Sequence, residues 1–244
     1  MVEPASRALV VLLGSELLTG EVSDENLPYL ARELFELGVE LTLALVLPDQ
    51  VELAARLIAP LYPQVDHLIT PGGIGPTPDD LTRELVCKLL DLPLVENPAA
   101  RRLIEQFYGP RLTPERLRMA LLPQGAEPIP SPSGGLPGFA VDKFICLPGI
   151  PGLVREMFPA VQERLRTAPF HRRSLEVRLG ESQLAPLLRR LENSFPDLAI
   201  GSYPHCGPDG WRTRIVVRGK DPARVGRCMA ELSRGISQLE GERT

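Results

Sequence analysis

The 244-residue sequence lacks the features of several protein classes. No apolar run approaches the roughly 18 residues that a membrane helix needs. The first residues show no cationic segment followed by an apolar one, as a secretory signal would. The four cysteines are far apart and form no C-x-x-C pair, which favours free thiols over a disulfide framework or a zinc site. These absences predict a cytoplasmic protein that does not cross a membrane.

Common nucleotide-binding and hydrolase motifs are missing as well. No Gly-Lys-Ser/Thr follows a glycine-rich loop, and there is neither a complete G-x-G-x-x-G fingerprint nor a G-x-S-x-G elbow. Histidine occurs only as His67, His171 and His205, and none stands in a pattern typical of a catalytic base or a metal ligand. The sequence therefore excludes a standard P-loop NTPase, a dinucleotide-binding dehydrogenase and a serine hydrolase of the elbow type.

The composition is that of a globular protein with unevenly distributed charge. Hydrophobic residues make up 43%, charged residues 24%, and the net charge is −4. Up to residue 170 there are 14 basic and 22 acidic residues, whereas beyond it there are 13 and 9. This change of sign predicts two domains, residues 1–168 and 171–244. The basic excess of the second is modest, so a solvated arginine-rich face is favoured and nucleic-acid binding is not expected.

Alternating short apolar runs and helical patterns predict the fold class. Strands are expected at 8–13, 41–47 and 65–70, and helices at 26–37, 51–61 and 79–90. Such alternation is typical of a doubly wound, mostly parallel α/β sheet. The second domain has a different pattern, with strands at 174–179, 198–203 and 212–218 and helices at 181–194 and 221–236. This order predicts a smaller α+β domain.

Glycines, hydroxyls and carboxylates follow the three predicted strands. Because ligands of parallel sheets bind beyond the carboxyl ends of the strands, these loops are expected to form one site. In the third loop, Gly72, Gly73 and Gly75 allow a close backbone approach to a ligand. Thr77 is suited to cap a helix that starts at Pro78, whose N-terminus would favour a phosphate.

Two acidic residues follow directly, Asp79 and Asp80. They complement the dipole of the predicted helix, which is one interpretation. Beside a phosphate they would repel the anion, and a divalent cation bridging carboxylates and phosphates removes that conflict, which is the other interpretation.

The loop sequences resemble those of the CinA competence/damage-inducible family. The strings that carry the resemblance are Gly14-Ser-Glu-Leu-Leu-Thr-Gly20, Gly72-Gly-Ile-Gly-Pro-Thr-Pro-Asp-Asp-Leu-Thr-Arg-Glu84 and Leu147-Pro-Gly-Ile-Pro151. The resemblance covers about residues 8–165. It implies a molybdopterin-binding-type domain, related to molybdopterin adenylyltransferases and to the N-terminal domain of eukaryotic FAD synthases. Residues 174–218 resemble the KH-like module of CinA-type proteins, and the amidase half of such proteins would lie beyond residue 244.

The resemblance implies a metal-dependent pyrophosphatase that acts on ADP-ribose, FAD or a similar nucleoside diphosphate compound. The family's functional carboxylates match Asp49 and Asp80, which are expected to hold Mg²⁺, Mn²⁺ or Co²⁺, while Asp79 or Glu16 orients or deprotonates water. An equal alternative is that Glu16 caps its own loop. The expected substrate-binding residues are Gly14, Ser15, Asn26, Gly72, Gly73, Gly75, Thr77, Ser133, Gly134, Pro148 and Gly149. Ser15 and Ser133 suit a simple turn role equally well.

Three departures from the family pattern bear on activity. Leu153 stands where the family's L-P-G-x-P-x-E segment has glutamate, and Glu156 lies three residues further on. The loop 134–139 lacks the family's threonine, and the loop after the first strand ends in Glu21 rather than glutamine. Two rivals therefore stay open, namely adenylyl transfer onto molybdopterin and a catalytically degenerate module that binds a nucleotide or pterin. The related families predict a homo-oligomer.

Overall fold

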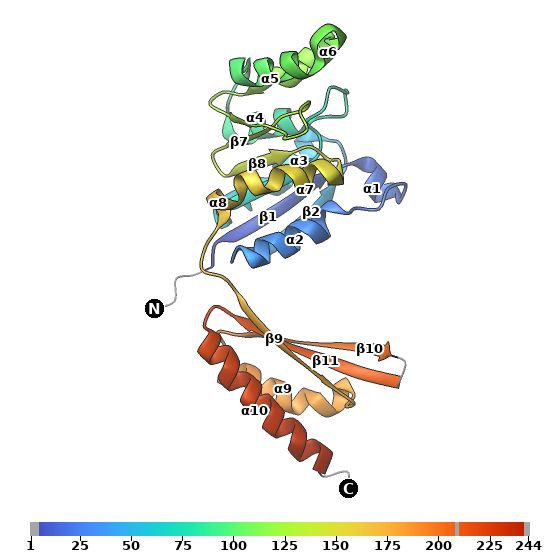
Figure 1. Ribbon diagram of the computed structural model, residues 1–244, viewed down its shortest axis with the longest axis vertical. Coiled ribbons are helices and arrows are strands. Elements are labelled where there is room, and N and C mark those ends of the chain that lie inside the picture. Colours follow the sequence, from blue (N-terminus) through green and yellow to red (C-terminus); the bar gives the residue numbers. More distant parts are fainter. Residues whose placement is uncertain (1–4, 208–209, 242–244) are drawn as a thin grey trace. The chain divides into compact units, whose positions relative to one another are not determined.

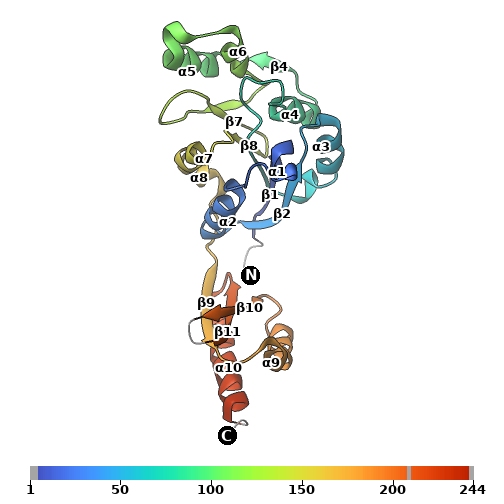
Figure 2. The same ribbon diagram turned by 90° about the vertical axis from the view of Figure 1, so that its right-hand side faces the viewer.

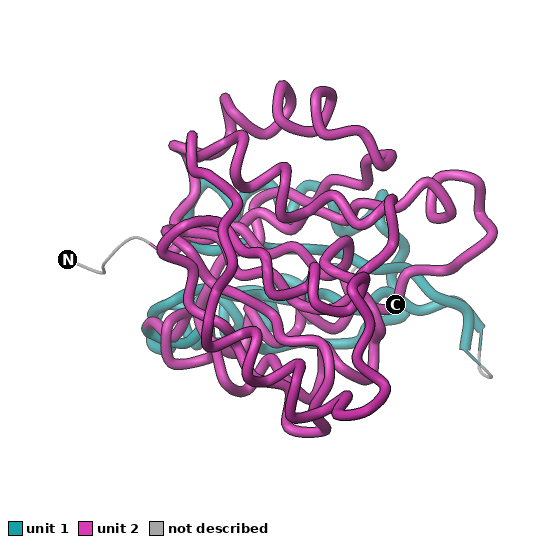
Figure 3. Tube along the Cα trace, turned by 90° about the horizontal axis from the view of Figure 1, so that it is seen from above, with its two compact units in different colours: residues 1–4, 168–244 teal, residues 5–167 magenta. Residues whose placement is uncertain are grey.

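The computed structural model describes residues 5–207 and 210–241 of the chain. They divide into two compact units, one of residues 5–167 and one that starts at Ala168 (Figures 1 and 3). Within the described residues, no helix combines the length and the apolar character that a membrane span requires. The four cysteines are all free, as the sequence predicted.

The first unit is built on a six-stranded sheet with the order β2-β1-β3-β8-β7-β6. The strands β2, β1, β3 and β8 run parallel, and β7 and β6 are antiparallel additions. Their bounds are β1 Arg7–Leu13, β2 Glu40–Leu47, β3 His67–Pro71, β6 Glu127–Ile129, β7 Gly138–Val141 and β8 Phe144–Leu147. The predicted doubly wound, mostly parallel sheet is confirmed.

Helices cover both faces of this sheet (Figure 2). Side chains of a strand alternate between faces, so Leu9 and Val11 pack into one core while Val10 and Leu12 pack into the other. The first core includes α3, α4 and α5, and the second includes α2, α7 and α8. The bounds are α2 Asn26–Glu36, α3 Val51–Ile58, α4 Thr82–Leu90, α5 Pro98–Tyr108, α7 Pro151–Met157 and α8 Gln162–Leu165.

Three shorter features complete the unit. The helices α1 (Ser15–Thr19) and α6 (Pro114–Leu117) are single turns, and β4 (Leu94–Glu96) pairs with β5 (Leu121–Pro123). The sequence predicted β2 as a strand, yet it lies at the sheet edge, where Leu43 and Val46 are more than one third exposed.

The second unit has the predicted β-α-β-β-α order. Its antiparallel sheet runs β10-β11-β9, and its helices pack on one core of Val177, Leu184, Ile215, Val217 and Leu232. The bounds are β9 His171–Val177, α9 Glu181–Ser194, β10 Ala199–Gly207, β11 Gly210–Gly219 and α10 Pro222–Gly241. A KH module that binds RNA carries a G-x-x-G loop between two helices. Gly207 and Gly210 have that spacing but stand between two strands, and the two residues between them lie outside the described residues.

Candidate functional site

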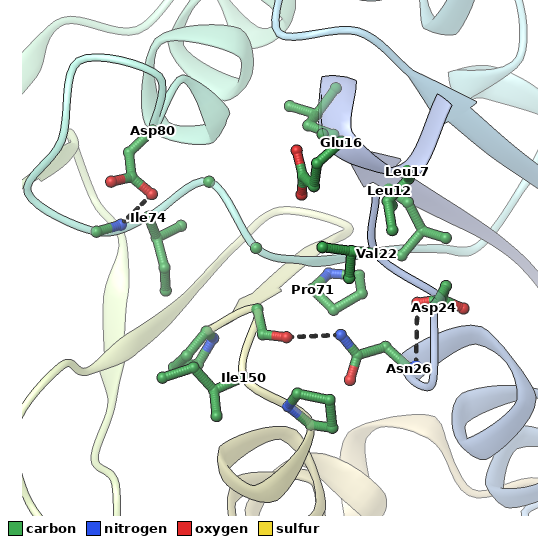
Figure 4. A pocket seen from close by; sticks show the side chains of 18 of the residues that line it. Leu12, Glu16, Leu17, Val22, Asp24, Asn26, Pro71, Ile74, Asp80 and Ile150 are labelled. Atoms are coloured by element: carbon green, nitrogen blue, oxygen red, sulfur yellow. Dashed lines mark hydrogen bonds between the residues drawn. The ribbon is translucent and has the colours of Figure 1, made fainter. Parts of the chain in front are cut away.

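A cavity of about 430 Å³ lies beyond the carboxyl ends of β1, β3 and β8 (Figure 4). We call it the large cavity. Its walls come from the loops that follow these strands, from the start of α2, and from Asp49 after β2. The sequence predicted this convergence, because parallel strands deliver their following loops to one sheet edge. Eleven predicted site residues line it, namely Gly14, Glu16, Asn26, Asp49, Gly72, Gly73, Gly75, Asp79, Asp80, Pro148 and Gly149.

The carbonyl groups of residues 72–75, the glycine loop, are all held by α4. Thr82 donates from Oγ1 to the oxygen of Gly72 (2.8 Å) and from its amide to that of Gly73 (2.9 Å). Arg83 donates from Nη1 to the oxygen of Ile74 and from Nη2 to that of Gly75, both at 2.8 Å. The first two residues of one helix thereby fix the orientation of four consecutive peptide groups.

This anchoring determines where the loop amides point. No described peptide bond is cis, and in a trans peptide the N–H points opposite to the carbonyl. With the carbonyls of Gly72 and Gly73 held toward α4, the amides of Gly73 and Ile74 point away from it. Both residues line the large cavity, and neither amide donates a hydrogen bond within the described residues. Two adjacent free amides of this kind are the arrangement that backbone anion sites use.

Glycine is required at position 73. Its φ of +67° is one that side-chain-bearing residues seldom adopt. A Cβ there would also lie 2.4 Å from Thr82 Oγ1. The bond from Thr82 and the turn at Gly73 thus depend on each other.

Asp80 organises its own loop rather than a helix terminus. Its Oδ1 accepts from the Gly75 amide (2.7 Å), and its Oδ2 accepts from the Thr77 amide (2.8 Å) and from the Thr77 hydroxyl. The predicted helix start at Thr77-Pro78 is wrong, since α4 begins at Thr82. Thr77 and Pro78 do carry a start signal, but here the carboxylate bonds draw residues 75–80 into a separate turn.

The other predicted carboxylates differ in how far they are engaged. Asp49 uses one oxygen, Oδ2, to accept from the amide and the hydroxyl of Ser15, both at 2.9 Å. The carboxylate of Glu16 accepts no hydrogen bond among the described residues, and Figure 4 shows it directed toward the glycine loop. Asp79 is exposed, and the Thr77 hydroxyl lowers its carboxyl pKa. Glu16 and Asp79 are therefore available for chemistry.

The electrostatic character of the large cavity is one-sided. Six of its lining residues are acidic, namely Glu16, Asp24, Glu25, Asp49, Asp79 and Asp80. No lysine, arginine or histidine is among the described residues that line it. Arg83, whose guanidinium holds two carbonyls of the glycine loop, is only 4% exposed and lies behind that loop. Burial lowers its pKa, whereas the charges of Glu84 and Asp80 raise it.

Asn26 joins two walls of the cavity. Its Nδ2 donates to the oxygen of Gly149 at 2.8 Å, while its own amide is held by Asp24 Oδ1 at 3.0 Å. Asn26 is only 7% exposed, and its Oδ1 has no partner in the described chain. Gly149 in turn lies against Gly72, where an added Cβ would come within 3.1 Å of the Gly72 Cα. Asn26 and Gly149 therefore shape the cavity through contacts with protein groups.

Four predicted residues do not line the large cavity, namely Ser15, Thr77, Ser133 and Gly134. Ser15 is bound to Asp49 and Thr77 to Asp80, so both support lining residues. The Ser133 amide donates to Glu156, and Glu156 does not line the large cavity, so it does not stand in for the family glutamate missing at Leu153. Thr82 and Arg83 were not among the predicted site residues, although the Thr-Arg pair that follows Leu81, two residues after Asp80, was the available signal.

Two families match adjacent parts of the chain. The family described as "probable molybdopterin binding domain" matches residues 9–167. The family described as "FAD synthase, middle domain" matches residues 169–240. The expected KH-like assignment of the second unit is therefore not confirmed, although its α+β architecture is.

Individual relatives agree with these matches. A protein from Pyrobaculum calidifontis is 33% identical over 210 residues, covering 81% of this chain and 80% of the relative. A putative competence-damage inducible protein from Caldanaerobacter subterraneus subsp. tengcongensis is 32% identical over 97% of this chain, which spans only 59% of that relative. The crystal structure of the protein CinA with unknown function from Thermoplasma acidophilum has a TM-score of 0.62 and 29% identity, covering 66% of this chain and 100% of that one.

Proposed function

Because the chain belongs to the probable molybdopterin binding domain family, we propose that its large cavity binds the phosphates of a nucleotide or pterin compound and hydrolyses a phosphoanhydride bond in it. One observation carries this proposal. The amides of Gly73 and Ile74 are oriented by Thr82, lack partners in the described chain, and line a cavity large enough for a small ligand.

The acidic lining requires a cation for such a ligand to bind. The donor set consists of hard carboxylate oxygens, which suit Mg²⁺ or Mn²⁺, and Mg²⁺ sites typically combine one or two carboxylates with substrate phosphates. No group of three or more His, Cys, Asp or Glu able to hold a metal occurs in the described chain, so substrate oxygens would have to complete the coordination. Asp49 Oδ1 is unengaged and Asp80 Oδ1 accepts one bond, so these two oxygens would hold the ion.

The chain's own groups then have separate tasks. The amides of Gly73 and Ile74 bind phosphoryl oxygens and stabilise the charge that develops on them during cleavage. Glu16, whose carboxylate is directed toward the loop, positions or deprotonates the attacking water, and Asp79 is the second group available for that role. A bound divalent cation would neutralise the phosphate charge and lower the pKa of water.

The test is a product screen with matched variants. ADP-ribose, FAD and NAD are incubated with Mg²⁺, Mn²⁺ or Co²⁺ or with a chelator, and release of AMP is measured. We expect metal-dependent AMP release that falls by about 10²–10⁴-fold in Glu16→Gln, the usual range for loss of a general base. Glu36→Gln is the control, because Glu36 is exposed and does not line the cavity. Equal turnover in all three proteins would remove Glu16 from the chemistry.

One feature favours two alternative functions. The first is binding of a nucleotide or pterin without hydrolysis, and the second is adenylyl transfer onto molybdopterin. Leu153 offers no carboxylate, and Glu156 is bound to the Ser133 amide. Both alternatives predict nucleotide binding with no product in the screen. Adenylyl transfer further predicts that ATP is consumed only after molybdopterin is added.

A further inference from the structure

The antiparallel sheet of the second unit has one face that its own helices leave open. Both α9 and α10 pack on the other face, in one core with Ile215 and Val217 of the central strand β11 (Figure 1). Because the side chains of a strand alternate between faces, the intervening residues of β11 point to the open face, namely Arg212, Arg214, Val216 and Arg218. No further helix or strand belongs to the described part of this unit, so nothing in that part covers them.

This open face is basic. Residues directly opposite each other in an antiparallel pair share a face, so the pairing register adds side chains of β9 and β10 to those of β11. The face then holds four arginines and one described carboxylate, namely Arg172, Arg212, Arg214, Arg218 and Glu176. That carboxylate lies 3.6 Å from Nε2 of His205. The modest basic excess of the unit is therefore gathered largely on one face, which a charge count along the sequence averages out.

Two of these arginines are placed where they do not help the sheet. Arg172 of β9 stands directly opposite Arg218 of β11, and both side chains are exposed. Like charges at directly opposed positions destabilise an antiparallel pair. An anion bound between them would remove the repulsion. The pair is therefore better suited to an anionic ligand than to the stability of the sheet.

Tyr203 adds an accessible aromatic ring to the same face. It stands opposite Arg214, whose guanidinium carbon lies 5.9 Å from the ring centroid. The ring leans along β10 over Gly201, where a Cβ would come within 2.8 Å of the Tyr203 hydroxyl. The side chain nevertheless stays 47% exposed. Since Gly201 covers the side of the ring toward the sheet, the exposed part is the side that faces away from it.

We propose that this open face binds single-stranded nucleic acid. Proteins that bind single strands without sequence preference combine a positively charged surface along the backbone with aromatic side chains on which bases stack. Guanidinium groups suit phosphates, because their planar donors form paired hydrogen bonds, and Tyr203 supplies the stacking surface. From Arg212 to Arg218, β11 extends over about 20 Å, a length that accommodates several nucleotides.

Other readings of the face are less well supported. An acidic protein segment would match the charge, but the exposed Tyr203 ring favours bases. The surface is also separate from the large cavity, which belongs to the first unit. The inference therefore does not depend on the proposed function.

The test uses labelled oligonucleotides and two matched pairs of variants. Binding of fluorescein-labelled dT12 and rU12 to the full chain is measured by fluorescence anisotropy, with a chelator present so that cation-dependent binding in the large cavity does not contribute. Arg214→Gln with Arg218→Gln is compared with Arg189→Gln with Arg190→Gln, which removes the same charge from exposed residues of α9. Tyr203→Leu is compared with Tyr203→Phe, which keeps the ring. Circular dichroism checks that each variant is folded.

We expect both oligonucleotides to bind, with a Kd that rises by about 20- to 50-fold from 50 to 200 mM NaCl, as three or four phosphate contacts to a single strand require. Arg214→Gln with Arg218→Gln should weaken binding and lower the logarithmic salt slope by about 1.4, whereas the α9 pair should change neither. Tyr203→Leu should raise the Kd by about 5- to 150-fold, the range of one stacked base, and Tyr203→Phe should leave it unchanged. A lower Kd for one oligonucleotide identifies DNA or RNA as the partner.

Three results would overturn the inference. The first is no binding of either oligonucleotide at 50 mM NaCl. The second is an equal loss of affinity in the two arginine pairs, which would mean that net charge and not the open face is responsible. The third is self-association of the chain that only Arg214→Gln with Arg218→Gln abolishes, without oligonucleotide binding, which would identify an acidic protein surface as the partner. Unchanged affinity in Tyr203→Leu would rule out base stacking.

Discussion

Replacing Thr82 by valine tests how the glycine loop is oriented. Valine has nearly the same shape but no hydroxyl, so the Gly72 carbonyl loses the donor that lies 2.8 Å away. Thr82 is fully buried, so water is unable to replace that bond. Leaving a fully buried carbonyl without a donor costs about 1–3 kcal/mol of unfolding free energy, and the part-buried bond to Gly72 lies toward the lower end of that range. Freed from this anchor, the Gly72–Gly73 peptide no longer holds the Gly73 amide toward the cavity.

The effect on ligand binding follows from the same bond. A hydrogen bond to a charged group contributes about 1.5–3 kcal/mol, so losing the oriented Gly73 amide raises the Kd of pyrophosphate by about 10- to 150-fold. Thr82→Ser is the matched control, because it keeps the hydroxyl. Unfolding of the first unit is followed by circular dichroism, since Trp211, the only tryptophan, lies in the second unit. If Thr82→Val binds pyrophosphate as tightly as Thr82→Ser, the loop is not oriented in this way.

Three other changes have defined outcomes. Gly73→Ala should lower the unfolding free energy of the first unit by about 1–2 kcal/mol because of the φ of +67° alone. The clash of the new Cβ with Thr82 should lower it further, and an unchanged Tm would contradict this. Asp80→Asn should weaken both the turn of residues 75–80 and metal-dependent catalysis, so Tm and AMP release should both fall. If neither falls, Asp80 has neither role. With a thiol-reactive dye at pH 8, exposed Cys206 should react in the folded state and buried Cys146 only on unfolding, and rapid labelling of Cys146 would refute its placement. Burial raises the pKa of Cys146 to about 12 from 9.0, so its contribution to stability is complete below pH 9 and is lost as the pH rises toward 12.

The sequence was informative about the sheet and about the position of the site. The apolar strands and the helices between them identified the parallel sheet, and the rule for parallel sheets brought the loops after β1, β2 and β3 together. The antiparallel strand β6 was not anticipated, because it has only three residues and includes Pro128. Short segments of this kind have no hydrophobic period of their own.

The internal hydrogen bonds of the site were not predictable in the same way. Thr77-Pro78 is a helix-start signal, but the Asp80 carboxylate accepts from the Gly75 amide as well as from Thr77. These bonds close a separate turn over residues 75–80, and α4 starts at Thr82. Arg83 is a charged residue, which is rarely buried, and only the three-dimensional structure shows that two carbonyls compensate it. Ser133 is separated from the large cavity because its amide binds Glu156, a contact between residues 23 positions apart.

The central claim is that oriented amides and carboxylates in the large cavity bind a diphosphate together with a cation. Titration calorimetry of pyrophosphate, with Mg²⁺ and again with a chelator, measures this directly. The account predicts binding with Mg²⁺ and a large loss of affinity without it, because every charged residue among the described residues that line the cavity is acidic. Equal affinity in the two conditions, or no binding in either, would contradict it.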